Sequence, residues 1–180
     1  VREIEEKRQG AESTFAALYQ WLATHPPAGD AIDVMRFRAW KALGYTNIYT
    51  PIMDVMRDQR WGRNEDVYSE APYLVAELGV QVIEGVQSKG VASTVKHFVL
   101  YSDPKGAREG QARTDPQLTP REVENVMLYP FRRAFGEAHA MGTMSSYNDY
   151  DGLPISGSTY WLIDRLRGDL NFTGYVVSDS

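Results

Sequence analysis

The chain has 180 residues, of which 43% are hydrophobic and 24% charged, a composition typical of a single packed globular domain. Its net charge of −5 comes without a cluster of basic residues, which argues against nucleic acid as a partner. Cysteine is absent, which excludes disulfides and thiolate metal sites but leaves the cellular compartment open. No apolar run approaches the roughly 20 residues that span a bilayer, so no membrane partner is expected.

The first part of the chain is predicted to be helical. A polar helix is predicted over residues 2–25, and Pro26-Pro27 interrupts it. A second helix is predicted over residues 31–43, with Gly44 as the residue that ends it. No signal peptide is visible at the start, and the chain stops directly after a strand-like run, which we expect of a fragment.

From there on, strands and helices are predicted to alternate. Short runs rich in β-branched and aromatic residues predict strands over residues 46–50, 91–98, 141–147 and 174–179. Between them, helices are predicted over residues 72–88, from residue 119 onward and over 158–167. Residues 51–71 and 101–118 are predicted to be long polar loops, and 149–154 a turn.

Local signals refine these helices. Thr119 and Glu122 form a capping-box pattern, and Pro130 is expected to kink or split the helix that begins there. Ser158 is the expected cap of the next helix. On helix 72–88, one apolar face is predicted, made of Val75, Leu78, Val82 and Val86. Two further residues are predicted to be core, Met144 and Trp161.

The alternation predicts an α/β fold in which helices cover a parallel sheet. Four such units are about half of an eight-stranded TIM-type barrel, so residues 31–180 are interpreted as a partial (β/α)8 barrel domain and 1–30 as an atypical helical N-terminal segment. A doubly wound open sheet is the competing architecture. No G-x-G-x-x-G stands at a strand-to-helix turn, so a dinucleotide-binding fold is not favoured.

Polar residues stand at the ends of three predicted strands. They are Lys96 and His97, Tyr147, and Asp179. In a parallel barrel these ends meet at the face that carries the active site, so we expect the four side chains to converge. The loop 57–63 adds Arg-Asp-Gln-Arg-Trp-Gly-Arg, which is either a surface loop with weak ion pairs or a site for a hydroxylated or anionic substrate.

These motifs resemble the N-terminal barrel of the family 3 glycoside hydrolases, which include β-glucosidases and β-xylosidases. The resemblance rests on Arg-Asp-x-Arg-Trp-Gly-Arg at 57–63, Lys-His at 96–97, Ser-Tyr-Asn at 146–148 and Gly-x-Val-Val-Ser-Asp at 174–179, in that order. It covers about residues 40–180. The chain departs from the family pattern in carrying Asp66 where Glu is more common, and Ala71 where a capping Asp is usual.

The resemblance implies a retaining exo-β-glycosidase that removes terminal glucose or xylose by double displacement, without a cofactor or metal. It implies that Asp179 is the nucleophile, that Arg63, Lys96 and His97 bind hydroxyls of the sugar, and that Tyr147 is the ring beside the nucleophile. The substrate is expected to be an oligo- or aryl-β-glycoside. The general acid/base is not assigned in this chain and is expected from a missing C-terminal domain or a second chain. An earlier sugar-binding Asp of the family is not found in residues 1–30.

Two alternatives remain from the residues. A lysine at a barrel strand end, here Lys96, is also the nucleophile with which Schiff-base aldolases begin, although this leaves Asp179 and the 57–63 loop without roles. The other alternative is a non-catalytic barrel fragment that at most binds sugar, with two open sheet edges that favour aggregation.

Overall fold

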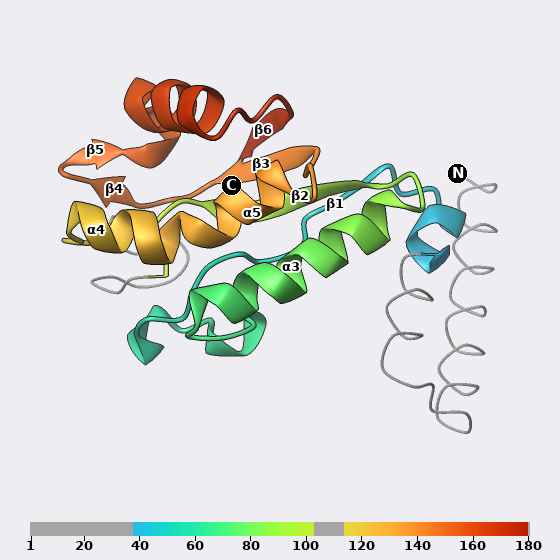
Figure 1. Cartoon of the computed structure of the whole chain (residues 1–180), viewed down its shortest axis with the longest axis horizontal. Coiled ribbons are helices and arrows are strands. Elements are labelled where there is room, and N and C mark those ends of the chain that lie inside the picture. Colours follow the sequence, from blue (N-terminus) through green and yellow to red (C-terminus); the bar gives the residue numbers. More distant parts are fainter. Residues whose placement is uncertain (1–37, 103–113, 180) are drawn as a thin grey trace, which may run out of the picture. The chain divides into compact units, whose positions relative to one another are not determined.

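The computed structural model describes residues 38–102 and 114–179 of the chain (Figure 1). It divides into two units, Val1–Tyr45 and Thr46–Ser180. In the first unit, the described residues form the end of a helix over 38–42, and Gly44 follows with φ +85°, as predicted for the residue that ends a helix. The predicted helix over 2–25, and the start of the one predicted over 31–43, lie outside the described residues.

Four parallel strands form the sheet of the second unit, in the order β1-β2-β3-β6. They are β1 (Asn47–Ile48), β2 (Ala92–Phe98), β3 (Gly142–Ser145) and β6 (Tyr175–Ser178). Beyond β1, the chain stays beside β2, because Met53 N donates to Lys96 O at 2.7 Å and Lys96 N donates to Pro51 O at 3.1 Å. The predicted α/β fold with a parallel half-barrel sheet is confirmed.

The connections carry helices and turns. They are η1 (Gln59–Trp61), η2 (Asn64–Asp66), α3 (Pro72–Gln87), α4 (Pro120–Glu122), η3 (Val123–Met127), α5 (Tyr129–Gly136), the hairpin β4 (Asp149–Tyr150) and β5 (Leu153–Pro154), η4 (Ile155–Gly157) and η5 (Tyr160–Asp169). Helices α3 and α5 pack on each other and both contact β2 (Figure 1). The polar loop predicted over 51–71 is confirmed, apart from the two short turns η1 and η2.

The local helix signals hold. Thr119 Oγ1 accepts from Glu122 N at 3.3 Å, and Glu122 Oε2 accepts from Thr119 N at 3.0 Å, so the capping box is formed. The helix is interrupted at Leu128 and resumes as α5, because Pro130 has no N–H to continue the ladder. Ser158 Oγ accepts from Trp161 N at 3.3 Å, as expected of a cap.

The predicted face of α3 is half wrong. Val75 and Val86 are buried, but Leu78 is 41% exposed and Val82 is only partly buried. The buried face instead includes Ala76, Gly79, Val80 and Ile83. At Gly79, an added Cβ would lie 2.3 Å from the Met53 sulfur. The helix therefore turns its small residues towards the chain beside β2, where close approach is needed, and a pattern that counts only large apolar residues misses this face.

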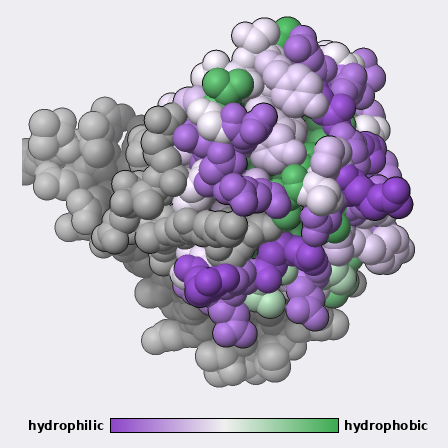
Figure 2. All heavy atoms as spheres, turned by 90° about the vertical axis from the view of Figure 1, so that its left-hand side faces the viewer, coloured by the Kyte–Doolittle hydropathy of each residue, from purple (hydrophilic) through white to green (hydrophobic). Residues whose placement is uncertain are grey.

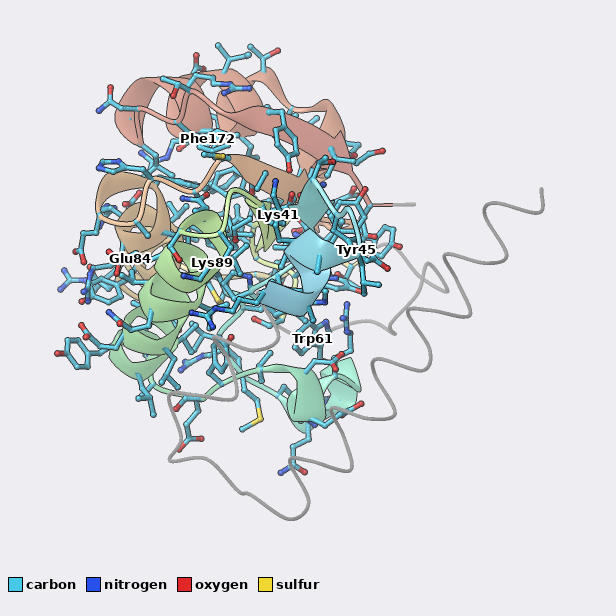
Figure 3. The ribbon with its side chains drawn as sticks, turned by 90° about the vertical axis from the view of Figure 1, so that its right-hand side faces the viewer. Lys41, Tyr45, Trp61, Glu84, Lys89 and Phe172 are labelled. Atoms are coloured by element: carbon cyan, nitrogen blue, oxygen red, sulfur yellow. The ribbon has the colours of Figure 1, made fainter. Side chains whose placement is uncertain are left out.

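The hydrophobic core lies between the sheet and its helices. Phe98 of β2 meets Phe131 of α5 edge-to-face, with ring centroids 5.4 Å apart. Phe172, after η5, lies 4.5 Å from the ring of Phe135 and sits between η5 and α5 (Figure 3). The two predicted core residues are buried as expected, with Met144 5% and Trp161 2% exposed.

The N-terminus of α3 provides a test of stability. Its cap position, Ala71, has extended backbone angles and no side-chain acceptor, and the side chain is exposed. We expect Ala71→Asp to raise the free energy of unfolding by roughly 0.5–2 kcal/mol, because a carboxylate there can accept from the free N–H groups of the first turn. Urea unfolding would measure the gain, and Ala71→Leu, which supplies no acceptor, should not reproduce it. Equal midpoints for Ala71→Asp and the parent would contradict the prediction.

Candidate active site

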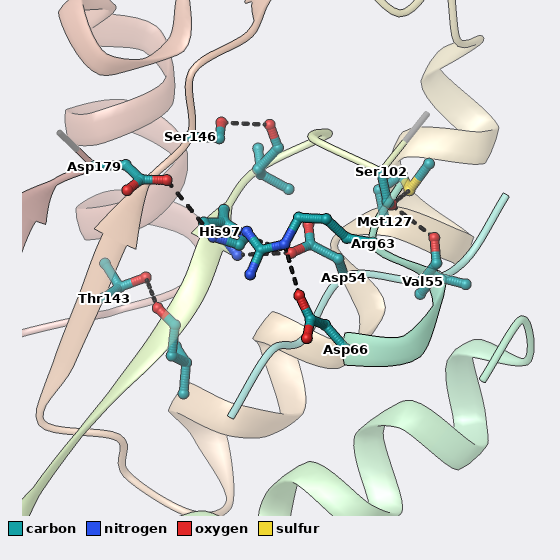
Figure 4. A network of polar contacts seen from close by, with 12 residues as sticks. Asp54, Val55, Arg63, Asp66, His97, Ser102, Met127, Thr143, Ser146 and Asp179 are labelled. Atoms are coloured by element: carbon teal, nitrogen blue, oxygen red, sulfur yellow. Dashed lines mark hydrogen bonds and ion pairs between the residues drawn. The ribbon is translucent and has the colours of Figure 1, made fainter. Parts of the chain in front are cut away.

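The carboxyl ends of the strands bring chemically active side chains to one edge of the sheet (Figure 4). Lys96 and His97 lie near the C-terminal end of β2, and Asp179 directly follows β6. Arg63 arrives from the loop between η1 and η2. Of the four strand-end side chains expected to converge, His97 and Asp179 lie 3.6 Å apart, and Arg63 of the 57–63 loop joins them beside His97.

His97 is the centre of this group, with a side chain that is 1% exposed. Its Nε2 lies 3.1 Å from Arg63 Nη1 and 3.6 Å from Asp179 Oδ2. On the other side of the ring, Nδ1 lies 2.7 Å from Asp54 Oδ2 (Figure 4). The imidazole therefore separates a buried carboxylate from a more open one, because the side chain of Asp179 is 19% exposed.

Arg63 is held in place from two directions. Its Nε donates to Asp66 Oδ2 at 2.8 Å, while Nη1 faces His97, and the guanidinium lies 5.8 Å from the ring centre of Trp61. Burial is the largest single effect and acts to lower the pKa of Arg63, but the hydrogen bond to Asp66 and the negative charge nearby together outweigh it, so the pKa lies above its usual value. The shorter acid at position 66 thus still reaches the arginine.

Lys96 is half-buried beside the same charges. Burial lowers its pKa below the usual range, and the positive charge of Arg63 acts in the same direction, while Asp179 acts against them. A lysine so placed is a less hydrated donor than one on the surface, which suits a contact with a hydroxyl group.

A cluster of three aromatic rings reaches His97 through one of them, Tyr101. Tyr101 lies 4.8 Å from the imidazole, 5.3 Å from the ring of Trp61 and 5.6 Å from that of Tyr147, all close to edge-on. Tyr147 is therefore connected to His97 through Tyr101. Its expected place beside Asp179 stays a prediction.

Local sequence features hold the loop and the strands. Asp58 caps η1 by accepting from Arg60 N at 2.8 Å, and Gly62 turns the chain with φ +80°, which places Arg63. Ser146 Oγ donates to Val99 O at 2.9 Å and ties the end of β3 to the chain after β2. The end of β2 that carries His97 is thus hydrogen-bonded on one side to the chain that follows β1 and on the other side to the end of β3.

Asp54 was missed as a candidate from the sequence. It is 3% exposed and accepts from both His97 N, at 3.0 Å, and His97 Nδ1. Because Asp54 lies within the loop predicted over residues 51–71, its carboxylate is expected from the sequence to be solvent-exposed, like the other charges of that loop. The available signal was the apolar pair Ile52-Met53, which continues the strand direction and makes Asp54 a strand-end carboxylate like Asp179.

Within residues 38–102 and 114–179, no group of three or more His, Asp or Glu side chains is arranged to hold a metal ion. No helix in this part of the chain is long and apolar enough to cross a membrane.

A separate hollow of about 310 Å³ opens on the part of the molecule that carries α4 and the β4–β5 hairpin. Figure 2 shows this side as mainly hydrophilic, with scattered hydrophobic side chains. The hollow is lined by Pro120, Val123, Glu124, Tyr150, Asp151, Leu153, Ser158, Tyr160 and Trp161. One of its two acids, Glu124, is paired with Arg132 at 2.8 Å.

Comparison with known proteins agrees with this geometry. Residues 30–180 match the model of the glycosyl hydrolase family 3 N terminal domain. The chain is 38% identical over 152 residues to a β-xylosidase of Formosa agariphila, covering 79% of this chain and 21% of that protein. It is 37% identical over 139 residues to a β-glucosidase of Rhizobium radiobacter, covering 77% of this chain and 16% of that one.

Among solved structures, β-glucosidase 3B from Thermotoga neapolitana in complex with glucose superposes with a TM-score of 0.76 at 28% identity, covering 83% of this chain and 20% of that one. The chain thus spans about a fifth of the length of the relatives it matches. Both the sequence match and the shared fold lead to one conclusion: this chain belongs to glycosyl hydrolase family 3.

Proposed function

We propose that this chain carries the nucleophile half of a retaining exo-β-glycosidase. The observation that carries the proposal is the position of Asp179, which extends from the end of β6 with Oδ2 3.6 Å from His97 Nε2. Arg63 and Lys96 supply positive charge around the same carboxylate. A partly exposed carboxylate among fixed donors is the arrangement that a glycosidase nucleophile needs.

The reaction proceeds in two displacements. Asp179 attacks the anomeric carbon, a carboxylate–sugar bond forms, and the glycosidic bond breaks, with its oxygen taking a proton from a carboxylic acid. Water then attacks the same carbon, gives its proton to that second group, and releases the sugar and the free Asp179 carboxylate. The stereochemistry at the anomeric carbon is retained because it is inverted twice.

The sugar is held by donors around the nucleophile. Arg63 and Lys96 donate to its hydroxyls, His97 contacts a hydroxyl through Nε2, and Tyr147 borders the sugar. Because Arg63 is fixed by Asp66, its direction is set before the substrate arrives, which lowers the entropic cost of orienting the sugar.

The second carboxyl group is proposed to come from beyond this chain. In a retaining enzyme it lies about 5–5.5 Å from the nucleophile. Among residues 38–102 and 114–179, the other acids that contact the group around Asp179 are Asp54 and Asp66, which are paired with His97 and Arg63. The chain spans 21% of the β-xylosidase and 16% of the β-glucosidase, which leaves ample length for a further domain in a protein of that size.

For the substrate, terminal β-linked glucose or xylose is proposed. The support comes from the two relatives, whose names are β-xylosidase and β-glucosidase, and from the glucose bound to the Thermotoga neapolitana enzyme. The aglycone is proposed to be another sugar or an aryl group.

The direct test is to incubate the complete protein with 2-deoxy-2-fluoro glucosides and xylosides bearing a good leaving group. These reagents form the covalent intermediate but turn it over slowly. Peptide mass spectrometry is expected to place one sugar on Asp179. An adduct on another residue of folded protein would remove the assignment.

A non-catalytic sugar-binding role is the alternative outcome. It is favoured if glucose or xylose raises the melting temperature of the complete protein while neither reagent leaves an adduct. The Schiff-base alternative at Lys96 is tested in the same samples, because borohydride with a carbonyl substrate would then attach mass to that lysine.

A further inference from the structure

Asp54 and His97 form a buried pair whose role the proposed chemistry does not yet explain. Asp54 follows the segment that pairs with β2, and a single oxygen, Oδ2, accepts from His97 N at 3.0 Å and faces His97 Nδ1 at 2.7 Å. Both side chains are 1% exposed. The carboxylate of Asp54 therefore binds both the ring and the backbone N–H of His97. Because both side chains are buried, water has almost no access to compete for either hydrogen bond.

The opposite side of the ring determines where its proton lies. Arg63 Nη1 is 3.1 Å from His97 Nε2, and a guanidinium can only donate. Nε2 must therefore offer its lone pair, so the neutral ring carries its one proton on Nδ1 and donates it to Asp54. Asp179 Oδ2, at 3.6 Å from Nε2, lies beyond hydrogen-bond distance and does not alter this assignment.

From these contacts we infer that Asp54 is a positioning residue that holds His97 as the Nδ1–H tautomer, so that Nε2 accepts a hydrogen bond from Arg63 in the free protein and from a sugar hydroxyl in the complex. The second half of this statement rests on the proposed glycosidase function; the first does not. A hydroxyl at Nε2 is then required to be a donor to His97, and its oxygen is left to accept from Arg63 or Lys96, which have no acceptor of their own.

The arrangement has a consequence for the nucleophile. An unprotonated Nε2 offers no proton to Asp179, so the carboxylate of Asp179 is not consumed in an ion pair with the ring. Loss of Asp54 would free the imidazole to take the other tautomer, whose Nε2–H would point at the N–H groups of Arg63 and would be free to turn towards Asp179 instead.

The test uses ¹⁵N-histidine spectra of the complete protein without sugar, with a His97→Asn sample to assign the His97 signals. We expect Nε2 in the pyridine-type range and Nδ1 in the pyrrole-type range at neutral pH. Added glucose or xylose is expected to move the Nε2 signal within the pyridine-type range. A protonated Nε2, either as the other tautomer or as imidazolium, would overturn the assignment.

Three variants separate positioning from simple stability. Asp54→Ala removes the acceptor, and we expect mixed tautomers together with a fall in kcat/KM of about 10- to 100-fold, as for other residues that orient a ligand. Asp54→Asn keeps an amide oxygen that can accept from both His97 groups, so it is expected to retain the parent tautomer and most of kcat/KM. Asp164→Asn, at an exposed position on η5 outside the site, is the control and should leave the His97 signals unchanged.

The outcomes are distinguishable. A lower melting temperature for Asp54→Ala with unchanged His97 signals would reduce Asp54 to a structural role and overturn the inference. If Asp54→Ala does not fold, the spectrum of the parent and that of Asp54→Asn still decide the tautomer. Because the free-protein spectrum involves no substrate, it can fail while the fluorosugar still labels Asp179, and the labelling can fail while the tautomer is as inferred.

Discussion

Replacing Asp179 with Asn is expected to reduce kcat of the complete protein by roughly 10⁴- to 10⁶-fold, as for the loss of other covalent nucleophiles, while leaving its fold intact. The reason is that an amide cannot form the carboxylate–sugar bond, although it has nearly the same size. Because the donors on Arg63 and Lys96 and the contact through His97 Nε2 remain, we expect sugar binding to survive. Steady-state kinetics and calorimetric titration with glucose or xylose would measure the two effects.

The matched control is Asp164→Asn. Asp164 is exposed on η5, on the helix that precedes β6, and removing its charge there should leave kcat within about two-fold of the parent, as is usual for surface substitutions. The fluorosugar should label the Asp164→Asn variant and fail to label Asp179→Asn. Appreciable turnover by Asp179→Asn would show that another group is the nucleophile.

The largest expected effect on stability is that of Gly174→Ala. An added Cβ would lie 2.1 Å from the backbone oxygen of Met141 and 2.7 Å from the ring of Phe172. Backbone cannot move aside as a flexible side chain can, and the same oxygen accepts from Tyr175 N at 3.1 Å. We expect the free energy of unfolding to fall by about 1–3 kcal/mol or more, since overpacking displaces the strand.

The displacement should also reach the site, because Gly174 directly precedes β6 and Asp179 directly follows it. Gly136→Ala is the control: nothing lies within 4 Å of its added Cβ, and the residue is the last of α5, where Ala is neutral to stabilising. Urea unfolding and fluorosugar labelling of both variants measure the two effects. Equal stability of Gly174→Ala and Gly136→Ala would contradict the close contact between the start of β6 and Met141.

Local sequence was sufficient wherever the governing interaction is local. The capping box at Thr119 and Glu122 and the interruption at Pro130 depend on residues at most five positions apart, and both were predicted correctly. The strands were recognisable for a similar reason, because their β-branched and aromatic runs are short and bounded by polar turns. The regular alternation of strands and helices then implied the parallel sheet.

The face of α3 required tertiary structure. Its orientation depends on the approach of Met53 to Gly79, a contact between distant segments, and a helical pattern of large side chains cannot reveal which small residues are needed for close packing. Leu78 was assigned to the buried face because it is hydrophobic, but it is exposed because close packing at this helix requires small side chains.

The active site divides in the same way. By itself, the sequence determined the chain order of the strands, the presence of Lys96, His97 and Asp179 at strand ends, and the motifs of glycosyl hydrolase family 3. Only the tertiary structure decided that Asp54, 43 residues before His97, accepts from its ring, and that Arg63, 34 residues before it, faces the other nitrogen. The state of a buried imidazole follows from which donors and acceptors surround it in space, and those neighbours are set by the register of parallel strands, which no local stretch of sequence specifies.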